Sequence, residues 1–289
     1  MSIKLEAVTY TYGIGSPFEK KALYPLDLEI KEGDFIGIIG HTGSGKSTLV
    51  QLLNGLIQPT GGRVVIDGTD ISQKQEAARK AKRKVGMVFQ YPEYQLFEET
   101  IAEDIAFGPK NMGLTGLALQ ARVKEAMMFV GMDYEQYKDR SPFRLSGGQM
   151  RRVAIAGVIA MAPKYLILDE PSAGLDPVGR REIFAQIRAL HQEKGVTVIL
   201  ISHNMEDIAA MANRLLVLKQ GNVILDGNPL DIFSSQRSLL QGAGVAVPPI
   251  TELLHYLKHR GLVVGERVHT VEEGARLIYE AWKEKQHAH

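Results

Sequence analysis

The 289-residue chain has 34 Lys and Arg against 33 Asp and Glu, so its formal net charge of +1 at pH 7 argues against nucleic acid as a partner. Its 45% hydrophobic content is ordinary for a soluble globular protein, and the absence of cysteine excludes disulfides and thiolate metal sites. No secretory signal and no apolar run of about 18 residues is present, so we expect a cytoplasmic protein that meets a membrane only through a partner.

Hydrophobic patterning predicts strands that alternate with helices over residues 1–230. Continuous apolar runs such as FIGIIG at 35–40 are typical of strands buried on both faces, whereas alternating runs indicate one exposed face. The expected strands are 1–12, 24–31, 35–40, 62–68, 84–90, 165–170 and 197–203, with helices from Lys46 and near 177–193 and a hairpin around Gly221 and Asn222. This order predicts an α/β fold with a mostly parallel core sheet.

Residues 91–163 interrupt the alternation with a helical pattern that is broken at Gly108-Pro109 and at Ser141-Pro142. We therefore expect an inserted helical subdomain within an N-terminal domain of residues 1–234. A small C-terminal subdomain, residues 235–289, is expected to follow, with a glycine- and proline-rich linker near 242–249 ahead of its helices.

Two amphipathic helices are expected in that C-terminal subdomain. The first has an apolar face made of Ile250, Leu253, Leu254 and Leu257. The second opens with a capping box from Thr270 to Glu273. Its expected apolar face consists of Val271, Ala275, Ile278 and Trp282.

The segment GHTGSGKST at 40–48 fits the phosphate-loop pattern G-x-x-x-x-G-K-[ST] and lies between a predicted buried strand and a predicted helix. Glycines let backbone N–H groups approach phosphate oxygens, and the helix N-terminus adds a favourable dipole. Lys46 is expected to reach the β- and γ-phosphates, and the Ser47 hydroxyl to bind Mg²⁺. The candidate nucleotide-binding residues of this loop are Gly40, His41, Thr42, Gly43, Ser44, Gly45, Lys46, Ser47 and Thr48.

The run YLILDE at 165–170 delivers two carboxylates to the end of a buried strand, where ligands bind in sheets of this kind. Asp169 is expected to hold Mg²⁺, directly or through water. Glu170 is expected to orient or deprotonate the attacking water.

LSGGQ at 145–149 predicts a second helix start suited to an anion, in a chain that already has a complete phosphate loop. A head-to-tail dimer accounts for both, because this segment of one chain would then complete the nucleotide site of the other. Together with the phosphate loop, LILDEP, SAGLD at 172–176 and His203, the segment resembles the full motif set of an ATP-binding-cassette (ABC) ATPase, in family order. The resemblance implies ATP hydrolysis with ATP and Mg²⁺ as cofactors. It also implies an ABC-type domain with an antiparallel N-terminal β subdomain.

The resemblance further implies roles for single residues. Gln90 matches the Q-loop glutamine that contacts Mg²⁺ and the attacking water, and His203 matches the switch histidine that contacts the γ-phosphate. Tyr12 matches the aromatic residue that stacks on adenine, and Phe18 is a second candidate for that role. The residues expected to act on the partner's nucleotide are Ser146, Gly147, Gly148, Gln149 and Asp176.

Residues 89–114 resemble the ATPase subunits of energy-coupling factor (ECF) transporters, and residues 149–177 resemble the second of the two ATPase types in that group. Residues 235–289 resemble the group's dimer-contacting subdomain. Gly157 takes a place where many other cassettes carry arginine. The resemblance implies a peripheral subunit at the cytoplasmic face of the cell membrane that powers uptake of a vitamin or a transition-metal ion. The implied partners are a second related ABC ATPase, a transmembrane coupling protein and a substrate-binding membrane subunit.

Residues 91–107 interleave aromatic and acidic side chains, a pattern that favours a groove for a partner helix bearing arginine. The aromatic residues are Tyr91, Tyr94, Phe97 and Phe107, and the acidic residues are Glu93, Glu98, Glu99, Glu103 and Asp104. The alternative is a solvated acidic face over ordinary core aromatics.

Two other functions fit parts of the sequence. The chain would serve another ABC importer if residues 235–289 formed a regulatory domain. A soluble, non-transport ABC ATPase usually has coiled-coil insertions, or two cassettes with basic extensions, and this sequence has neither.

Overall fold

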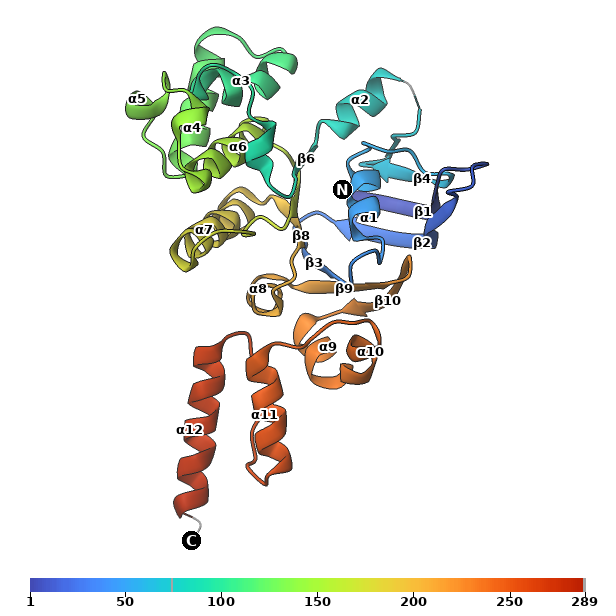
Figure 1. Ribbon diagram of the computed structural model, residues 1–289, viewed down its shortest axis with the longest axis vertical. Coiled ribbons are helices and arrows are strands. Elements are labelled where there is room, and N and C mark those ends of the chain that lie inside the picture. Colours follow the sequence, from blue (N-terminus) through green and yellow to red (C-terminus); the bar gives the residue numbers. More distant parts are fainter. Residues whose placement is uncertain (74, 288–289) are drawn as a thin grey trace.

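A six-stranded sheet forms the centre of the molecule (Figure 1). The structure is a computed structural model that describes residues 1–73 and 75–287. The strand order is β10-β9-β3-β8-β7-β6; all neighbours are parallel except β10 and β9, which are antiparallel. The strands are β3 (Phe35–Ile39), β6 (Val85–Val88), β7 (Tyr165–Asp169), β8 (Thr197–Ile201), β9 (Arg214–Lys219) and β10 (Asn222–Gly227). The predicted mostly parallel core sheet is confirmed.

A second, antiparallel sheet of four strands covers one face of the core (Figure 1). Its order is β2-β1-β4-β5, with β1 (Ser2–Tyr12), β2 (Lys20–Lys31), β4 (Gly61–Ile66) and β5 (Thr69–Asp70). Between the sheets lies α1 (Lys46–Leu53). Strand β2 begins at Lys20 rather than at residue 24, because residues 20–23 pair with the end of β1.

The two faces of the core sheet bury different residues of the same strand. In β3, Ile36 and Ile38 pack toward α1 and the antiparallel sheet, whereas Phe35 and Ile39 pack toward the helices on the other face. Burial on both faces explains why this strand is apolar at nearly every position.

The inserted helical subdomain packs against the second face through α6. Its elements are η1 (Pro92–Gln95), α3 (Ile101–Asn111), α4 (Gly116–Phe129), α5 (Tyr134–Tyr137), η2 (Pro142–Arg144) and α6 (Gly147–Ala160). The expected break at Gly108-Pro109 is wrong, because α3 continues through Pro109 to Asn111. The expected break at Ser141-Pro142 is confirmed by η2, which separates α5 from α6.

Helices α7 and α8 follow β7 and β8, and two short helices follow the β9–β10 hairpin. Their bounds are α7 (Pro177–Lys194), α8 (Met205–Met211), α9 (Pro229–Ser235) and α10 (Arg237–Gly242). The sequence did not predict α2 (Glu76–Lys82), which precedes β6. No helix among residues 1–73 and 75–287 is long and apolar enough to cross a bilayer.

The last two helices, α11 (Pro249–His259) and α12 (Val271–His287), extend from the body as a pair with a small core of its own (Figure 1). The predicted face of α12 is wrong except for Ile278, which packs against the small core as expected. Val271, Ala275 and Trp282 are exposed, and the side that packs on α11 contains Gly274, Leu277, Ile278 and Ala281. A Cβ at position 274 would collide with Ile250, so close approach at this glycine sets the rotation of α12. Leu253, expected on the buried face of α11, is also exposed.

Only half of the predicted capping box forms at α12. The Thr270 hydroxyl accepts a hydrogen bond from the Glu273 N–H at 3.2 Å. The Glu273 carboxylate accepts from the His269 N–H at 2.8 Å rather than from the N–H of Thr270.

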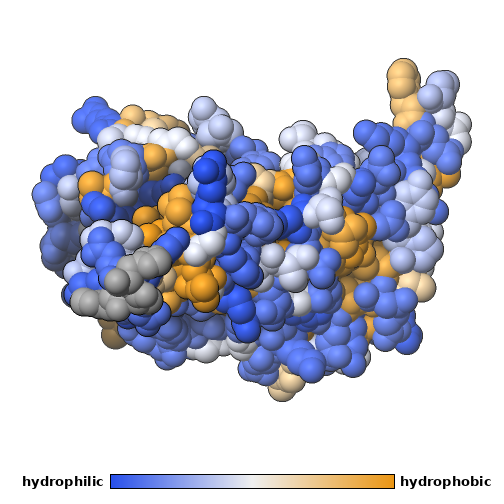
Figure 2. Space-filling model, turned by 90° about the horizontal axis from the view of Figure 1, so that it is seen from below, coloured by the Kyte–Doolittle hydropathy of each residue, from blue (hydrophilic) through white to orange (hydrophobic). Residues whose placement is uncertain are grey.

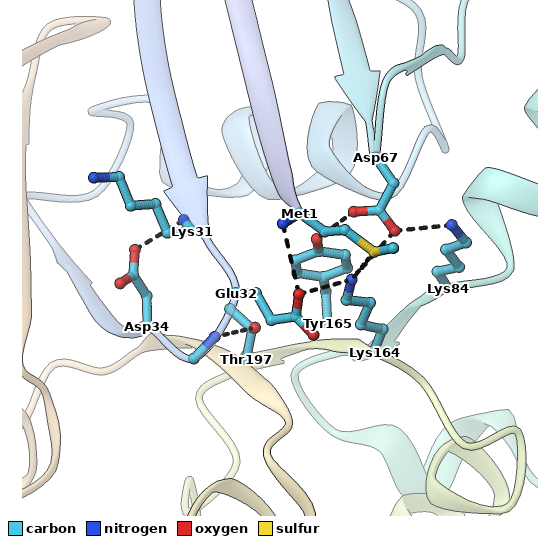
Figure 3. A network of polar contacts seen from close by, with 10 residues as sticks. Met1, Lys31, Glu32, Asp34, Asp67, Lys84, Lys164, Tyr165 and Thr197 are labelled. Carbon is cyan, nitrogen blue, oxygen red and sulfur yellow. Dashed lines mark hydrogen bonds and ion pairs between the residues drawn. The ribbon is translucent and has the colours of Figure 1, made fainter.

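A polar network centred on Asp67 joins the two sheets at the edge where the parallel strands begin (Figure 3). The Tyr165 hydroxyl donates to Asp67 at 2.7 Å, and the Lys84 ammonium donates at 2.8 Å. Lys164 lies between Asp67 and Glu32, at 3.4 Å and 3.1 Å from their carboxylates. The network therefore links both sheets, and it leaves the opposite strand ends free to form a site.

Candidate functional site

A cavity of about 760 Å³ opens at the carboxyl ends of the parallel strands and extends to the antiparallel sheet. Eleven of the predicted site residues line it: Tyr12, Thr42, Gly43, Gly45, Lys46, Ser47, Thr48, Gln90, Asp169, Glu170 and His203. These residues come from β1, from the loop before α1 and its first turn, from the end of β7, and from the segments that follow β6, β7 and β8. Segments separated by more than 150 residues of chain thus converge on one volume.

The phosphate loop has the backbone conformation that its glycines permit. Gly45 caps α1 with φ of 108°, which side-chain-bearing residues rarely adopt, and a Cβ there would lie 2.9 Å from the Ala22 carbonyl oxygen. The Lys46 ammonium donates to the carbonyl oxygens of Gly40 and His41 at 2.6 and 3.1 Å. Burial lowers the pKa of Lys46, while the negative charges of Glu170 and Asp169 oppose that shift. Phosphate oxygens would replace these carbonyls as better acceptors for the ammonium.

Asp169 and Glu170 end β7 inside the cavity. Burial raises the pKa of both carboxyls, and the charges of Lys46 and His203 act in the opposite direction. Glu170 has φ of 52°, a left-handed conformation that costs energy in a residue with a side chain. Its Oε1 atom is buried and accepts no hydrogen bond from the part of the chain that the structure describes. A shielded carboxylate oxygen with unused capacity suits a group that binds a water proton.

Tyr12 is at the cavity, and its hydroxyl lies 3.0 Å from the Thr48 hydroxyl of α1. The ring is 42% exposed and is therefore open to a ligand on one side. Phe18 is 85% exposed and does not line the cavity. The geometry thus favours Tyr12 over Phe18 as the residue that contacts a base.

The LSGGQ segment and Asp176 lie outside their own chain's cavity. Ser146 and Gln149 form a reciprocal capping box at the start of α6, and Asp176 caps α7 by accepting from the Gly179 N–H at 2.7 Å. Within the described chain, a Cβ at Gly148 would meet only Leu175, at an ordinary 3.8 Å. Intramolecular packing within the described residues therefore does not require glycine at 148.

Comparison with known proteins decides the family. The family described as "ABC transporter" matches residues 23–173. The "Energy-coupling factor transporter ATP-binding protein EcfA2" of Clostridium tetani is 53% identical over 285 residues, which cover 99% of this chain and 99% of the relative. The chain belongs to the ABC transporter family, among the ATP-binding proteins of ECF transporters. As an ABC transporter ATPase it binds and hydrolyses ATP, and the hydrolysis is coupled to transport.

Two solved ABC structures support the fold. The structure of cbiO1 from Clostridium perfringens, described as part of the ABC transporter complex cbiONQ, covers 90% of this chain and 98% of its own, with 35% identity and a TM-score of 0.73. The ATP-binding cassette MJ0796, dimeric and bound to ADP and Pi, covers 78% of this chain and 98% of its own, with 31% identity and a TM-score of 0.70.

Part of this ABC cavity was not predicted. The additional lining residues are Lys20, Lys21, Ala22, Tyr24, Ile201, Gln220 and Gly221. Lys20 pairs with Tyr12 in the sheet, and the Gly221 carbonyl accepts from the Tyr24 N–H at 3.0 Å, so β2 and the β9–β10 turn close the side of the site. In the sequence, the only sign of these additional residues was the pair Lys20 and Lys21 shortly before the predicted strand at 24–31.

The aromatic and acidic segment beside Gln90 is only partly as predicted. Tyr91, Tyr94, Phe97 and Phe107 are all exposed. Three of the five acids are engaged within the chain. Glu93 pairs with the buried Arg151, Glu103 caps α3 together with Thr100, and Asp104 accepts the N–H groups of residues 97 and 98. The side chains of Glu98 and Glu99 make no hydrogen bond or ion pair within residues 1–73 and 75–287.

Proposed function

We propose that the chain is the motor subunit of an ECF importer that takes up a vitamin or a transition-metal ion. It acts at the cytoplasmic face of the cell membrane, together with a second related ABC ATPase, a transmembrane coupling protein and a membrane subunit that binds the substrate. The residue roles below belong to the same proposal.

In the proposed site, ATP lies between two ATPase subunits. Lys46 and the loop amides hold the phosphates, Tyr12 stacks on adenine, and Ser47, Gln90 and Asp169 hold Mg²⁺. Glu170 accepts a proton from the attacking water, and His203 contacts the γ-phosphate. The partner subunit receives Ser146, Gly147, Gly148, Gln149 and Asp176 of this chain at its own nucleotide. The open position at Gly148 supports this arrangement.

A surface hollow beside the segment that follows Gln90 is the proposed docking site for the coupling protein. It has a volume of about 350 Å³ and is bounded by α3 and α6. Phe97 and Phe107 meet edge to face at its wall, with ring centroids 4.8 Å apart. Gly157 lies on its floor, where a Cβ would find its nearest neighbours at 3.9 Å. An apolar hollow with exposed aromatic walls suits a partner helix.

The exposed side of α11 and α12 is the proposed contact with the second ATPase. Leu253, Tyr256, Val271, Tyr279 and Trp282 are each about half exposed there. Seen from the end that carries these helices, hydrophobic side chains form patches on the surface (Figure 2). The ECF relative from Clostridium tetani matches the chain through this region, which argues against an unrelated regulatory domain.

The observation that carries the docking proposal is the hollow over Gly157, and it can be filled without disturbing the nucleotide site. Gly157→Arg should leave ATP binding within twofold of wild type, while the membrane proteins no longer co-purify with the full chain. Met128→Arg, at an exposed position of the same subdomain away from the hollow, is the matched control. Normal assembly of Gly157→Arg would contradict this docking site, and recovery of the wild-type chain without membrane proteins would contradict the importer.

A further inference from the structure

Arg151 is a fully engaged buried cation outside the nucleotide cavity. It lies on α6, two residues after the LSGGQ segment, and its side chain is 3% exposed. Its Nε and Nη2 groups donate to the two carboxylate oxygens of Glu93 at 3.1 and 2.9 Å. Its Nη1 group donates to the backbone carbonyl of Ala173. One guanidinium thus connects three segments of the chain.

Each of these segments carries a residue of the proposed site. Glu93 lies in η1, three residues after Gln90 and within the proposed docking region. Ala173 lies between Glu170 and Asp176, and its N–H donates to the Glu170 carbonyl at 3.1 Å. Helix α6 begins at the residues proposed to contact the partner's nucleotide. A displacement of η1 therefore acts directly on the loop behind the catalytic carboxylate.

The pairing of Arg151 with Glu93 is better suited to fixing the geometry of the chain than to adding stability. A guanidinium presents its donors in a rigid planar fork, so the two-point pairing with Glu93 fixes the direction of the third donor. A buried ion pair contributes little net stability, because the cost of removing both charges from water offsets their attraction. The main effect of such a pair is therefore to hold the segments it joins in one arrangement. Tyr91 adds to this restraint, with its ring centroid 5.9 Å from the guanidinium.

We propose that Arg151 is a positioning residue for hydrolysis. It holds residues 172–176 at a fixed distance from η1, and so it transmits the docking of the membrane partner to the loop that follows Glu170. The transmission rests on the docking site proposed above, whereas the positioning of residues 172–176 does not.

The first test separates positioning from folding. Arg151→Met removes the fork but leaves the Glu93 carboxylate buried without a partner, so this variant can lose stability. The double variant Arg151→Met/Glu93→Met removes both charges and restores a neutral interior. In both, we expect kcat for ATP to fall roughly 10- to 100-fold, the scale of a small misplacement near a reacting group, with KM within twofold. Wild-type kcat in a folded double variant would overturn the proposal.

Arg152 provides the matched control. It is the next residue of α6, it is partly exposed, and it pairs with Glu182 of α7 rather than with η1 or residues 172–176. Arg152→Met should leave kcat within about threefold of wild type, because a surface pair contributes little. An equal fall in kcat for both arginine variants would overturn the specific role of Arg151.

The second test addresses transmission. Glu93→Gln keeps one acceptor oxygen for Arg151, but its NH2 group cannot accept the second guanidinium donor, so the two-point pairing that aligns η1 with residues 172–176 is lost. Hydrolysis without membrane components should fall no further than in Arg151→Met, whereas the fold-stimulation by reconstituted membrane components should drop at least fivefold. Full stimulation of Glu93→Gln would overturn transmission. If the wild-type chain is not stimulated, the docking proposal fails, while kcat of the double variant still decides the positioning role.

Discussion

His203 Nε2 lies 3.4 Å from Glu170 Oε1, although the two residues follow different strands of the core sheet. The contact arises because β7 and β8 are parallel neighbours and Asp169 pairs with Ile201, so both chains leave the sheet at one edge. The glutamate side chain is 12% exposed and the histidine 63%. A shielded carboxylate therefore faces a histidine that solvent and nucleotide can both reach.

The environment of Glu170 in this pair predicts the pH below which hydrolysis is lost. Burial raises the pKa of Glu170 above its ordinary value of 4.5, with the charge of His203 opposing the shift. The proposed role requires the ionised form, so activity should be present above the raised pKa and should fall as pH decreases through it. A profile of kcat/KM against pH, which reports groups of the free enzyme, should therefore place the acid limb above pH 4.5, with folding monitored at each pH. A limb at or below 4.5 would contradict the assignment.

Glu170→Gln preserves the shape of the side chain and removes its charge. ATP should still bind, because Lys46 and the phosphate loop are unchanged, whereas hydrolysis should fall at least ~10²-fold, the usual contribution of a general base. The longer-lived ATP state should also accumulate as a dimer in size exclusion with ATP. Unchanged turnover would exclude Glu170 as the catalytic carboxylate.

Lys46→Ala removes the side-chain cation of the phosphate loop. Because the ammonium contacts loop carbonyls in a largely buried position, its loss should abolish measurable ATP affinity rather than reduce turnover alone. Equilibrium dialysis with ATP measures the effect. Lys4→Ala, which removes an exposed lysine of β1 paired with Glu29, is the control and should bind normally. ATP binding by Lys46→Ala within twofold of wild type would contradict the site.

Gly148→Asp tests whether the LSGGQ segment serves the other subunit. The chain has room for the new side chain, and its own phosphate loop is intact, so ATP should bind nearly normally. The carboxylate would face the partner's γ-phosphate and repel it, so dimer closure and hydrolysis should fail. Crosslinking from γ-modified ATP should label residues 146–148 of one chain and the Lys46 loop of another. Both labels on one chain would disprove the head-to-tail arrangement.

Asp67→Asn tests the network that joins the two sheets. Burial by itself would raise the pKa of Asp67, but hydrogen bonds from Lys84 and Tyr165 and the charge of Lys164 lower it overall. The stabilisation is therefore present above the ordinary pKa of 3.8 and is lost as pH falls through the lower folded-state value. Asparagine tolerates the left-handed backbone at 67, so the substitution does not strain the chain. Because it removes the charge from these hydrogen bonds, the variant should lose roughly 1.5–3 kcal/mol of unfolding free energy at pH 7.

The pH dependence makes the Asp67 test specific. In urea unfolding, the difference between wild type and Asp67→Asn should begin to shrink below about pH 4, where the carboxyl of the unfolded chain starts to bind protons, and should vanish below the lowered folded-state pKa. A difference that stays constant down to pH 2 would show that the lost stability is not electrostatic.

The parts of the site that lie on consecutive residues could be predicted from the sequence. The phosphate loop and the carboxylates at the end of β7 need only a local pattern, a buried strand followed by a defined run of residues. Six of the nine loop residues and both carboxylates line the cavity. The alternation of apolar strands and helices likewise predicted the parallel core sheet. Local chain geometry is sufficient for such elements.

Contacts between distant segments could not be predicted in this way. Lys20 and Lys21 reach the cavity because β2 pairs with β1, and Glu93 faces inward because Arg151 arrives from a helix 58 residues away. Periodicity placed Val271 and Trp282 on the buried side of α12, but the close approach of Gly274 to Ile250 turned the helix away from that face. A sequence specifies which residues are apolar or charged, whereas the packing of separate segments selects which of them are buried and which charges meet.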